Sequence, residues 1–399
     1  MDKILVLAST YPRWKGDTEP AFIEYLCSEL AKNFEVHVLC PHYPGAAREE
    51  RNGNIQVYRY RYFFDPGETL AYEGGILSGL RSNRHRYLLI PFFLLFQIIA
   101  LVRLDAKHRF DIVHAHWIIP QGLIAVFARK IFRGRYRILL TAHGGDLYGL
   151  KSALFRSLKK KIIQACDHLS VVSNAMKQDC IAMGIGAEHI SVCSMGVDLE
   201  NLFVSRKPYE QRSDLVYVGR LVEKKGVVYL VRAISVLKKA GRQVHLRIIG
   251  DGPERDMLET LAGELDINDC IEFMGSVPNK EIPGYLNNAR IFIMPSVVSV
   301  DGDQEGLGLV AVEAMGCGCV VIASDLPPVR DVIENGVTGV LVTPGSGQKI
   351  ADAITALLDD PEKAGVLAIK GREYVAGRFD WKQVGKNYSG LLTGLINSV

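Results

Sequence analysis

The chain alternates short runs of apolar, β-branched residues with longer amphipathic stretches. This alternation is typical of parallel sheets that carry helices on both faces. Between the runs, segments such as Ala21–Ala31 place Phe22, Leu26 and Leu30 on one face of a helix. In the first half, the pattern predicts strands at Ile4–Ala8, Glu35–Leu39, Ile55–Arg59, Ile112–His114, Ile138–Thr141 and Leu169–Val172.

The same alternation restarts after a polar stretch at residues 204–212. We therefore predict an α/β protein with two doubly wound domains in tandem. Ligands of such sheets bind beyond the carboxyl ends of the strands, so a site in a cleft between the two domains is expected. The second set of predicted strands is Leu215–Val218, His245–Ile249, Ile271–Phe273, Ile291–Met294, Val320–Ala323 and Gly339–Val342.

Composition places the chain among globular proteins and predicts a reducing compartment. Apolar residues make up 48% of the 399 residues and charged residues 23%. The eight cysteines show no CxxC pair and no zinc spacing, which favours reduced thiols packed as small apolar groups in the cytoplasm. The opening MDKILVLAST fits a buried strand better than an export signal.

Charge is unevenly distributed along the chain. Residues 1–199 carry 25 Lys+Arg and 18 Asp+Glu, whereas residues 200–399 carry 22 and 26. Much of the basic excess brackets the most apolar stretch, Tyr87–Val102, which is shorter than the roughly 20 residues of a membrane span. Two interpretations remain open for it: a buried core helix, or a face that docks on anionic lipid with basic flanks steering it to the headgroups.

The segment EGLGLVAVE at residues 305–313 is the most informative motif. A glycine-rich start that runs into a helix lets backbone approach a ligand and offers free N–H groups to an anion. Glu305 and Glu313 can then reach different parts of one ligand, which suits hydroxyls flanking a diphosphate. The alternative is a capping residue and a solvated one. The glycines and the first helical residues are Gly306, Gly308, Leu309 and Val310.

A second motif, GRLVEKKG at residues 219–226, follows the predicted strand Leu215–Val218. Arg220 and Lys225 are expected near one point beyond the sheet, where a guanidinium and an ammonium together suit a diphosphate. This charge can substitute for Mg²⁺. The alternative is an ordinary solvated turn.

Histidines mark the strand ends of the first half. His143 follows a strand directly, so it is expected at the carboxyl end of that strand, facing the cleft. Because His114 and His116 match no usual metal spacing with it, and their rings are expected to point alternately, we predict core or lining histidines and no metal. Gly16 can present backbone N–H groups to a ligand at the start of the first helix; the alternative is a plain surface loop.

Together these motifs resemble the pattern of glycosyltransferase family 4, retaining enzymes with the GT-B fold of two facing Rossmann-like domains. EGLGLVAVE matches the family's E-x7-E motif, GRLVEKKG its donor-phosphate site and MGVD at 195–198 its interdomain junction. The resemblance covers nearly the whole chain. It implies an acceptor domain at 1–204, a donor domain at 205–381, and a C-terminal helix at about 382–399 that returns to the first domain after Phe379-Asp380-Trp381.

The resemblance also implies roles for single residues. Arg220 and Lys225 neutralise the departing diphosphate, Glu313 holds the ribose and Glu305 the donor sugar. Many family members have two glycines in the N-terminal loop, whereas this chain reads Lys15-Gly16-Asp17-Thr18-Glu19, which puts the phosphate contact of that loop in doubt. The remaining donor positions are Gly16, His143, Val277, Gly306, Leu307, Gly308, Leu309 and Val310, and Asp17 and Asp146 are candidates for the acceptor.

We therefore predict a retaining, metal-independent and cofactor-free transferase for cell-surface polysaccharide or glycolipid. The expected partners are a UDP- or GDP-sugar, a lipid-linked or oligosaccharide acceptor and an anionic membrane surface, with no nucleic acid; the expected location is the cytoplasm, peripheral on the inner face of the membrane. A nucleotide-sugar epimerase of the same fold and a non-catalytic sugar-nucleotide binding module are the alternatives. A nicotinamide-dependent oxidoreductase is disfavoured because neither half contains GxGxxG with an acidic residue about 20 positions on.

Overall fold

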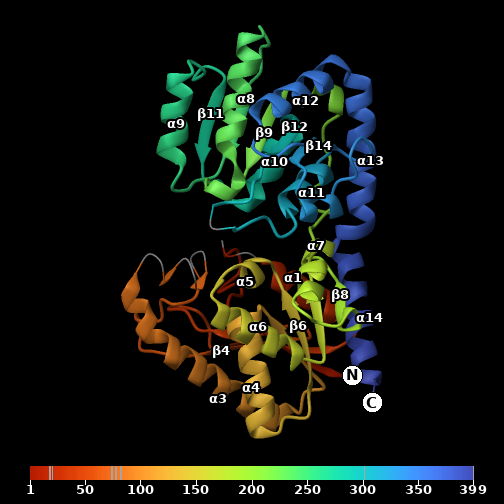
Figure 1. The fold of residues 1–399 in the computed structure, drawn as a ribbon. Helices are drawn as coiled ribbons and strands as arrows, with labels where there is room; N and C mark the ends of the chain where they lie inside the picture. Colours follow the sequence, from red (N-terminus) through yellow and green to blue (C-terminus); the bar gives the residue numbers. More distant parts are fainter. Residues whose placement is uncertain are drawn as a thin grey trace. The chain divides into compact units, whose positions relative to one another are not determined.

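The computed structural model describes residues 1–17, 19, 21–72, 75, 76, 79, 80, 83–300 and 302–398. Thr18 of the loop at 15–19 therefore lies outside the described residues. The chain forms two compact units (Figure 1). The N-terminal unit contains residues 1–172, 176–195 and 384–399, and the C-terminal unit contains 173–175 and 196–383.

The N-terminal unit is built on an eight-stranded sheet with the order β3-β4-β2-β1-β5-β6-β7-β8. All neighbouring strands are parallel except β3 and β4. The six strands predicted for this half are confirmed, and β3 and β8 were not predicted. The strands are β1 (Lys3–Leu7), β2 (Glu35–Pro41), β3 (Glu49–Asn52), β4 (Ile55–Tyr60), β5 (Ile112–His116), β6 (Arg137–Ala142), β7 (His168–Val171) and β8 (Ile190–Val192).

Helices cover this sheet, and the predicted helix near Ala21–Ala31 is confirmed as α1. The last helix, α14, anchors to the N-terminal unit through the fully buried Tyr388, whose hydroxyl donates to the carbonyl of Cys193 at 3.1 Å and accepts from Ser170 at 3.3 Å. The helices are α1 (Phe22–Leu30), α3 (Ile90–His108, after a 3₁₀ turn at Arg84–Leu89), α4 (Leu123–Phe132), α5 (Gly145–Tyr148), α6 (Ala153–Gln164), α7 (Asn174–Ala182) and α14 (Trp381–Asn397).

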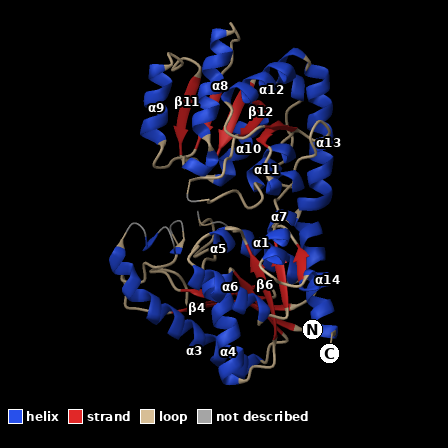
Figure 2. Cartoon of the chain, in the orientation of Figure 1, coloured by secondary structure: helices blue, strands red, loops and turns tan. Residues whose placement is uncertain are grey.

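The C-terminal unit has an all-parallel six-stranded sheet with the order β11-β10-β9-β12-β13-β14. All six predicted strands are confirmed; β11 and β12 are labelled in Figure 2. They are β9 (Asp214–Val218), β10 (Leu246–Ile249), β11 (Ile271–Gly275), β12 (Ala289–Met294), β13 (Val320–Ser324) and β14 (Val340–Val342). The helices are α8 (Val227–Lys239), α9 (Arg255–Glu264), α10 (Ile282–Asn288), α11 (Leu309–Gly316), α12 (Gly347–Asp359) and α13 (Pro361–Phe379).

The chain divides between residues 195 and 196, whereas the sequence placed the boundary at 204. The intervening segment carries two buried apolar side chains, Leu199 and Phe203. Both lie against Gly316 of α11, where an added Cβ would be 2.4 Å from Leu199 Cδ2 and 2.8 Å from the Phe203 carbonyl oxygen. This packing assigns residues 196–203 to the C-terminal unit.

Candidate functional site

Two loops converge at the carboxyl ends of β9 and β12. These strands are neighbours, and the strand order reverses between them, which is where doubly wound sheets bind ligands. The carbonyl of Lys224 accepts a hydrogen bond from the backbone N–H of Val297 at 2.8 Å. Gly226 has φ 61°, and a Cβ there would lie 2.1 Å from the carbonyl oxygen of Pro295, so the loops pack backbone against backbone.

This convergence brings Lys225 and Glu305 into contact. Lys225 Nζ donates to Glu305 Oε2 at 2.5 Å, and the two side chains are only 17% and 15% exposed. Burial alone would raise the pKa of Glu305, but the charges of Lys225 and Lys224 and the hydrogen bond from Lys225 together lower it. The structure therefore holds a charged cation–carboxylate pair at the reversal point of the sheet.

The start of α11 follows Glu305 directly. Gly308 precedes the helix with φ 91°, and a Cβ at this position would lie 3.0 Å from the Sδ and Cε atoms of Met294. The N–H groups of Leu309 and Val310 open the helix, where backbone donors lack partners within the helix and attract anions. Gly306 is partly exposed, whereas the side chain of Leu307 is buried at 4% exposure, so Leu307 can offer a ligand only its backbone.

Glu313 lies in α11, four residues after its first residue, Leu309. Burial raises the pKa of its carboxyl to about 8, although the charge of Lys225 opposes this shift. Without a ligand, Glu313 is therefore largely protonated at neutral pH. A protonated carboxyl both donates and accepts hydrogen bonds, as do the hydroxyls of a sugar.

Arg220 and Val277 flank this site on neighbouring loops. The carbonyl of Arg220 accepts a hydrogen bond from the Tyr217 hydroxyl at 3.0 Å, which fixes the backbone after β9. The Arg220 side chain is exposed, and its guanidinium has no hydrogen-bond or ion-pair partner in the part of the chain that the structure describes. Val277 is partly exposed just beyond β11. Lys225 and Glu305 are thus in contact, while Arg220 and Val277 lie at the same edge of the sheet.

In the N-terminal unit, His143 follows β6 and contacts a second histidine. Its Nε2 lies 3.0 Å from Nδ1 of His116, and the two rings stack with centroids 5.2 Å apart. Burial lowers the pKa of all three histidines: to about 3 for His114 and His143, and well below the usual value for His116. These imidazoles are therefore neutral at physiological pH.

The expectation that the rings of His114 and His116 point alternately is wrong. Their centroids are 4.2 Å apart in β5. Residues i and i+2 of a strand share one face of the sheet, so this pair lies on the same side. The Nε2 atom of His114 lies 2.8 Å from the hydroxyl oxygen of Thr141 on the neighbouring strand β6.

The two carboxylates proposed for the acceptor are engaged within their own unit. Asp146 accepts from the backbone N–H groups of Ile118 and His143 at 2.8 and 2.9 Å, and burial raises its pKa. Asp17 forms an ion pair with Arg13 at 2.6 Å, and this hydrogen bond lowers the pKa of Asp17 to about 2. Gly16, beside it, is exposed with φ 80°.

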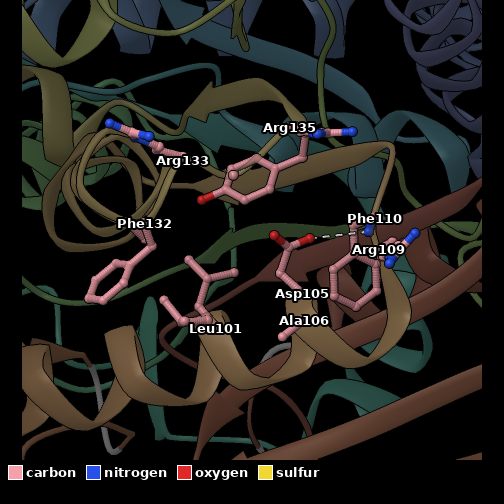
Figure 3. A pocket seen from close by; sticks show the side chains of 12 residues that line it. Leu101, Asp105, Ala106, Arg109, Phe110, Phe132, Arg133 and Arg135 are labelled. Carbon is pink, nitrogen blue, oxygen red and sulfur yellow. Dashed lines mark hydrogen bonds between the residues drawn. The ribbon is translucent and has the colours of Figure 1, made fainter.

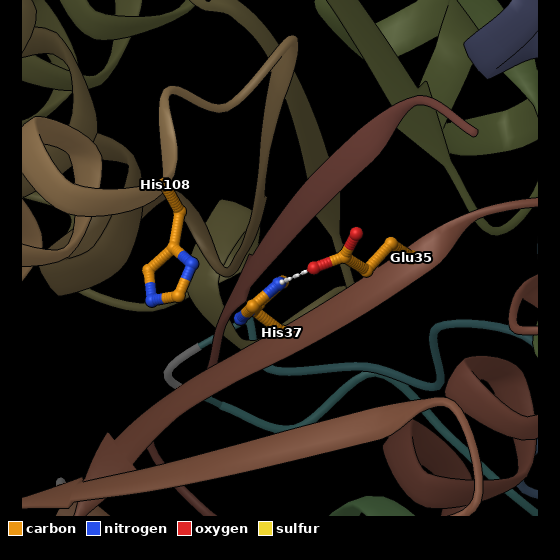
Figure 4. Close-up of side chains that lie close together, drawn as sticks. All are labelled: Glu35, His37 and His108. Atoms are coloured by element: carbon orange, nitrogen blue, oxygen red, sulfur yellow. Dashed lines mark hydrogen bonds and ion pairs between the residues drawn. The ribbon is translucent and has the colours of Figure 1, made fainter.

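Two further features of the N-terminal unit lie at the amino ends of its strands, whereas His143 follows a carboxyl end. A cavity of about 410 Å³ lies between α3 and α4, near the starts of β5 and β6 (Figure 3). Glu35, His37 and His108 cluster near the start of β2 (Figure 4). In this cluster His37 Nε2 lies 2.9 Å from Glu35 Oε1, and the neighbouring ammonium of Lys3 opposes a metal cation.

Two doubly wound units, one of them with a cation–carboxylate pair and a helix start where its strand order reverses, define the GT-B class of sugar-transferring enzymes. Residues 21–201 match the family model "Glycosyltransferase Family 4", and residues 198–374 match "Glycosyl transferases group 1". The chain therefore belongs to the glycosyltransferases, and it transfers a sugar from a nucleotide-sugar donor.

Named relatives agree with this family. The chain is 26% identical, over 98% of both sequences, to a GDP-mannose-dependent alpha-(1-6)-phosphatidylinositol monomannoside mannosyltransferase of Mycolicibacterium smegmatis. It is 32% identical to the amylovoran biosynthesis glycosyltransferase AmsK of Erwinia amylovora, over 63% of this chain and 62% of that protein. Both relatives are named as transferases, so the alternative of a nucleotide-sugar epimerase finds no support.

Solved structures share the fold over the whole chain. Sucrose-phosphate synthase from Thermosynechococcus elongatus superimposes with a TM-score of 0.77 at 22% identity, covering 100% of both chains. Anabaena HepE in complex with UDP superimposes with a TM-score of 0.72 at 20% identity, covering 99% of this chain and 100% of that one. The predicted GT-B fold class is thus confirmed.

Proposed function

We propose that this glycosyltransferase is retaining and metal-independent, and that it holds its donor at the start of α11. The ion pair between Lys225 and Glu305 is the observation that carries the proposal. It places a partly buried positive charge beside a helix start, as a departing diphosphate requires. Arg220 adds a second cation with an unpaired guanidinium in the described part of the chain, so these two charges take the place of Mg²⁺.

The other donor contacts are assigned from the positions of the residues in the two sequence motifs and at the edge of the sheet. Glu313 binds the ribose hydroxyls and Glu305 the sugar, while Leu309 and Val310 donate backbone N–H groups to phosphate. The base lies against the loop at Val277. The remaining donor contacts are the backbone of Gly306, Leu307 and Gly308, together with Gly16 and His143 from the N-terminal unit.

His143 donates a hydrogen bond to the donor sugar in this proposal. His116 Nε2 is buried without a partner among the described residues. Since buried N–H groups are almost always paired, His116 carries its proton on Nδ1 and donates it to His143 Nε2. His143 then carries its own proton on Nδ1, which leaves that N–H for a sugar oxygen.

In the proposed reaction, the acceptor oxygen bonds to the anomeric carbon on the face from which the diphosphate leaves. The bond between that carbon and the phosphate oxygen breaks, and the acceptor proton passes to the leaving phosphate. Lys225 and Arg220 stabilise the charge that develops there. Asp17 and Asp146 do not serve as nucleophiles, because their carboxylates are engaged by Arg13 and by backbone N–H groups.

We further propose a lipid-linked or oligosaccharide acceptor in the synthesis of a cell-surface polysaccharide or glycolipid, at the cytoplasmic face of a membrane. The names of the relatives, a phosphatidylinositol mannoside mannosyltransferase and an amylovoran transferase, favour such acceptors. The GDP-mannose-dependent relative and the UDP complex of HepE make GDP- and UDP-sugars the donors to compare.

A thermal-stability panel with UDP, GDP, ADP and dTDP in EDTA tests the donor site. A nucleotide at about a hundred times its dissociation constant stabilises the unit that binds it by about 2.7 kcal/mol. We expect one nucleotide to stand out, to act equally well without Mg²⁺, and to lose its effect in a Glu313→Ala variant. No response to any nucleotide, or a response that requires Mg²⁺, would contradict the proposal.

A further inference from the structure

Residues 84–108 form a helix that is long and apolar enough to cross a membrane, yet it packs against its own domain. The ring of Phe93 lies 5.6 Å from that of Tyr60 and 5.2 Å from that of Tyr62, and Gln97 and Leu101 are fully buried. One side of the helix therefore belongs to the core. Only 22% of its most apolar 18-residue stretch is buried, however, so the rest of that stretch is partly or fully exposed.

The outward side presents large apolar side chains. Leu88, Phe92 and Phe96 recur at helical spacing and are exposed, Leu88 to 71%. Phe63 extends this surface, since its ring lies 5.9 Å from that of Phe92 and 5.6 Å from that of Phe64. Helix α4, which lies beside α3 (Figure 2), adds exposed apolar residues. We call this surface the α3–α4 face; its members are Phe63, Phe64, Leu88, Phe92, Leu95, Phe96, Phe127, Ile131 and Phe132.

The sequence around this face is strongly basic. Residues 83–137 contain ten Lys+Arg and two acidic residues, Asp105 and Asp111. Soluble proteins rarely expose apolar patches of this kind without a partner. An apolar surface with a basic surround matches the interface of an anionic bilayer, where basic side chains meet headgroups and apolar ones enter the acyl boundary.

The cavity between α3 and α4 borders this face at Phe132 (Figure 3). Its wall includes Leu101 and Phe132, and Arg109, Arg133 and Arg135 also line it. All three arginines are exposed, and the guanidinium groups have no hydrogen-bond or ion-pair partner among the residues that the structure describes. The acidic lining residue Asp105 accepts a hydrogen bond from the Phe110 backbone at 3.2 Å.

We infer that the α3–α4 face docks this protein on an anionic phospholipid bilayer, and that the arginines of the cavity bind a lipid phosphate. This inference goes beyond the transfer reaction and does not depend on it. The apolar side chains supply attachment to any bilayer, while the arginines select anionic lipid, since guanidinium groups suit phosphate oxygens.

Two of the arginines allow a test that separates binding from folding. Arg109 and Arg133 end α3 and α4 in the left-handed conformation, with φ 54° and 55°. Glycine is the usual residue at such positions because it has no Cβ to strain the backbone. Arg109→Gly with Arg133→Gly thus removes two charges while relieving strain, so the double variant is expected to keep its thermal stability.

The experiment is flotation of the full-length protein with vesicles, in the absence of nucleotide sugar. Vesicles of pure phosphatidylcholine are compared with vesicles that contain 30% phosphatidylglycerol. Each basic residue at an anionic surface contributes about fivefold to binding, so the double arginine variant should bind anionic vesicles roughly 25-fold more weakly. Leu95→Gln with Phe96→Gln should weaken binding to both kinds of vesicle.

Lys363→Gln with Lys370→Gln is the charge-matched control, because these exposed lysines lie on α13 of the other unit. This control should bind vesicles like the wild type. In a separate arm, 10 mM inorganic phosphate should not displace the wild-type protein from vesicles. Absence of vesicle binding, equal binding of the double arginine variant, or equal loss in the lysine control would each overturn the inference. Because no sugar is transferred in this assay, these outcomes are independent of the donor test.

Discussion

Removing the ammonium of Lys225 is the most direct perturbation of the donor site. Lys225→Ala deletes the charge that lies 2.5 Å from Glu305 and leaves that carboxylate, only 15% exposed, without its main partner. Two separate effects follow: the departing diphosphate loses a stabilising cation, and the folded protein retains an unpaired buried carboxylate.

The catalytic effect is expected to be the larger one. An aimed charge or donor of this kind contributes about 3 kcal/mol to the transition state, so turnover should fall by roughly a hundredfold or more. The cost in stability lies between that of an exposed pair, about 0–1 kcal/mol, and that of a broken buried pair, about 3–5 kcal/mol. The charge of Lys224 remains near Glu305, so we expect about 2 kcal/mol and a fall in Tm of about 4–8 °C.

Lys224→Ala is the matched control for this variant. Its side chain pairs with Asp303 at 3.1 Å, at 27% and 44% exposure, so its loss should cost less than about 1 kcal/mol. Initial rates with saturating donor and a Tm for each variant separate the two effects. A folded Lys225→Ala protein with full turnover would refute the assignment, and so would equal losses in the two variants.

Three further predictions concern single residues. Glu313→Gln should flatten the pH dependence of stability. The wild type without nucleotide should lose stability from about pH 4.5 to about pH 8, because the folded-state pKa of Glu313, about 8, exceeds the usual glutamate value of 4.5, and denaturant titrations across this range would show it. Gly308→Ala should cost about 1 kcal/mol or more, because alanine strains φ 91° and its Cβ would contact Met294 at 3.0 Å. The resulting shift of the backbone before α11 should abolish nucleotide binding in calorimetry, and unchanged binding would contradict the proposed backbone approach. Tyr388→Phe should lower the free energy of unfolding in urea by about 1 kcal/mol, because the hydrogen bonds of the hydroxyl to Ser170 and Cys193 are lost. An unchanged free energy of unfolding would show that these bonds do not anchor α14.

The strands of both units could be predicted because apolar, β-branched runs are long enough to register as buried strands. The two strands that were not predicted lack that signal. β3 reads EERN, an edge strand whose charged side chains are mostly exposed. β8 has only three residues, Ile190–Val192, at the other edge of the same sheet. Edge strands are defined by the partner they pair with, and a local pattern does not contain that partner.

The site was predictable as motifs but not as contacts. Glu305 and Lys225 could each be predicted as site residues, because each lies in a glycine-containing loop after a strand. Their ion pair, however, requires β9 and β12 to be neighbours, and only the sheet order provides this. The contact between His116 and His143 likewise depends on the pairing of β5 with β6. Asp146 was a candidate for a ligand contact, whereas its carboxylate holds the backbone at Ile118 and His143.

The apolar stretch at 87–102 shows why composition could not choose between a core helix and a lipid-facing one. Both require apolar residues around the helix, and the difference lies in what surrounds them. Phe93 and Leu101 are buried on the domain side, whereas Leu88 and Leu95, chemically the same kind of residue, are exposed. A helix that was apolar only for packing would carry polar residues on its outer face. The outward leucines and phenylalanines therefore need a separate reason, and a bilayer surface supplies one.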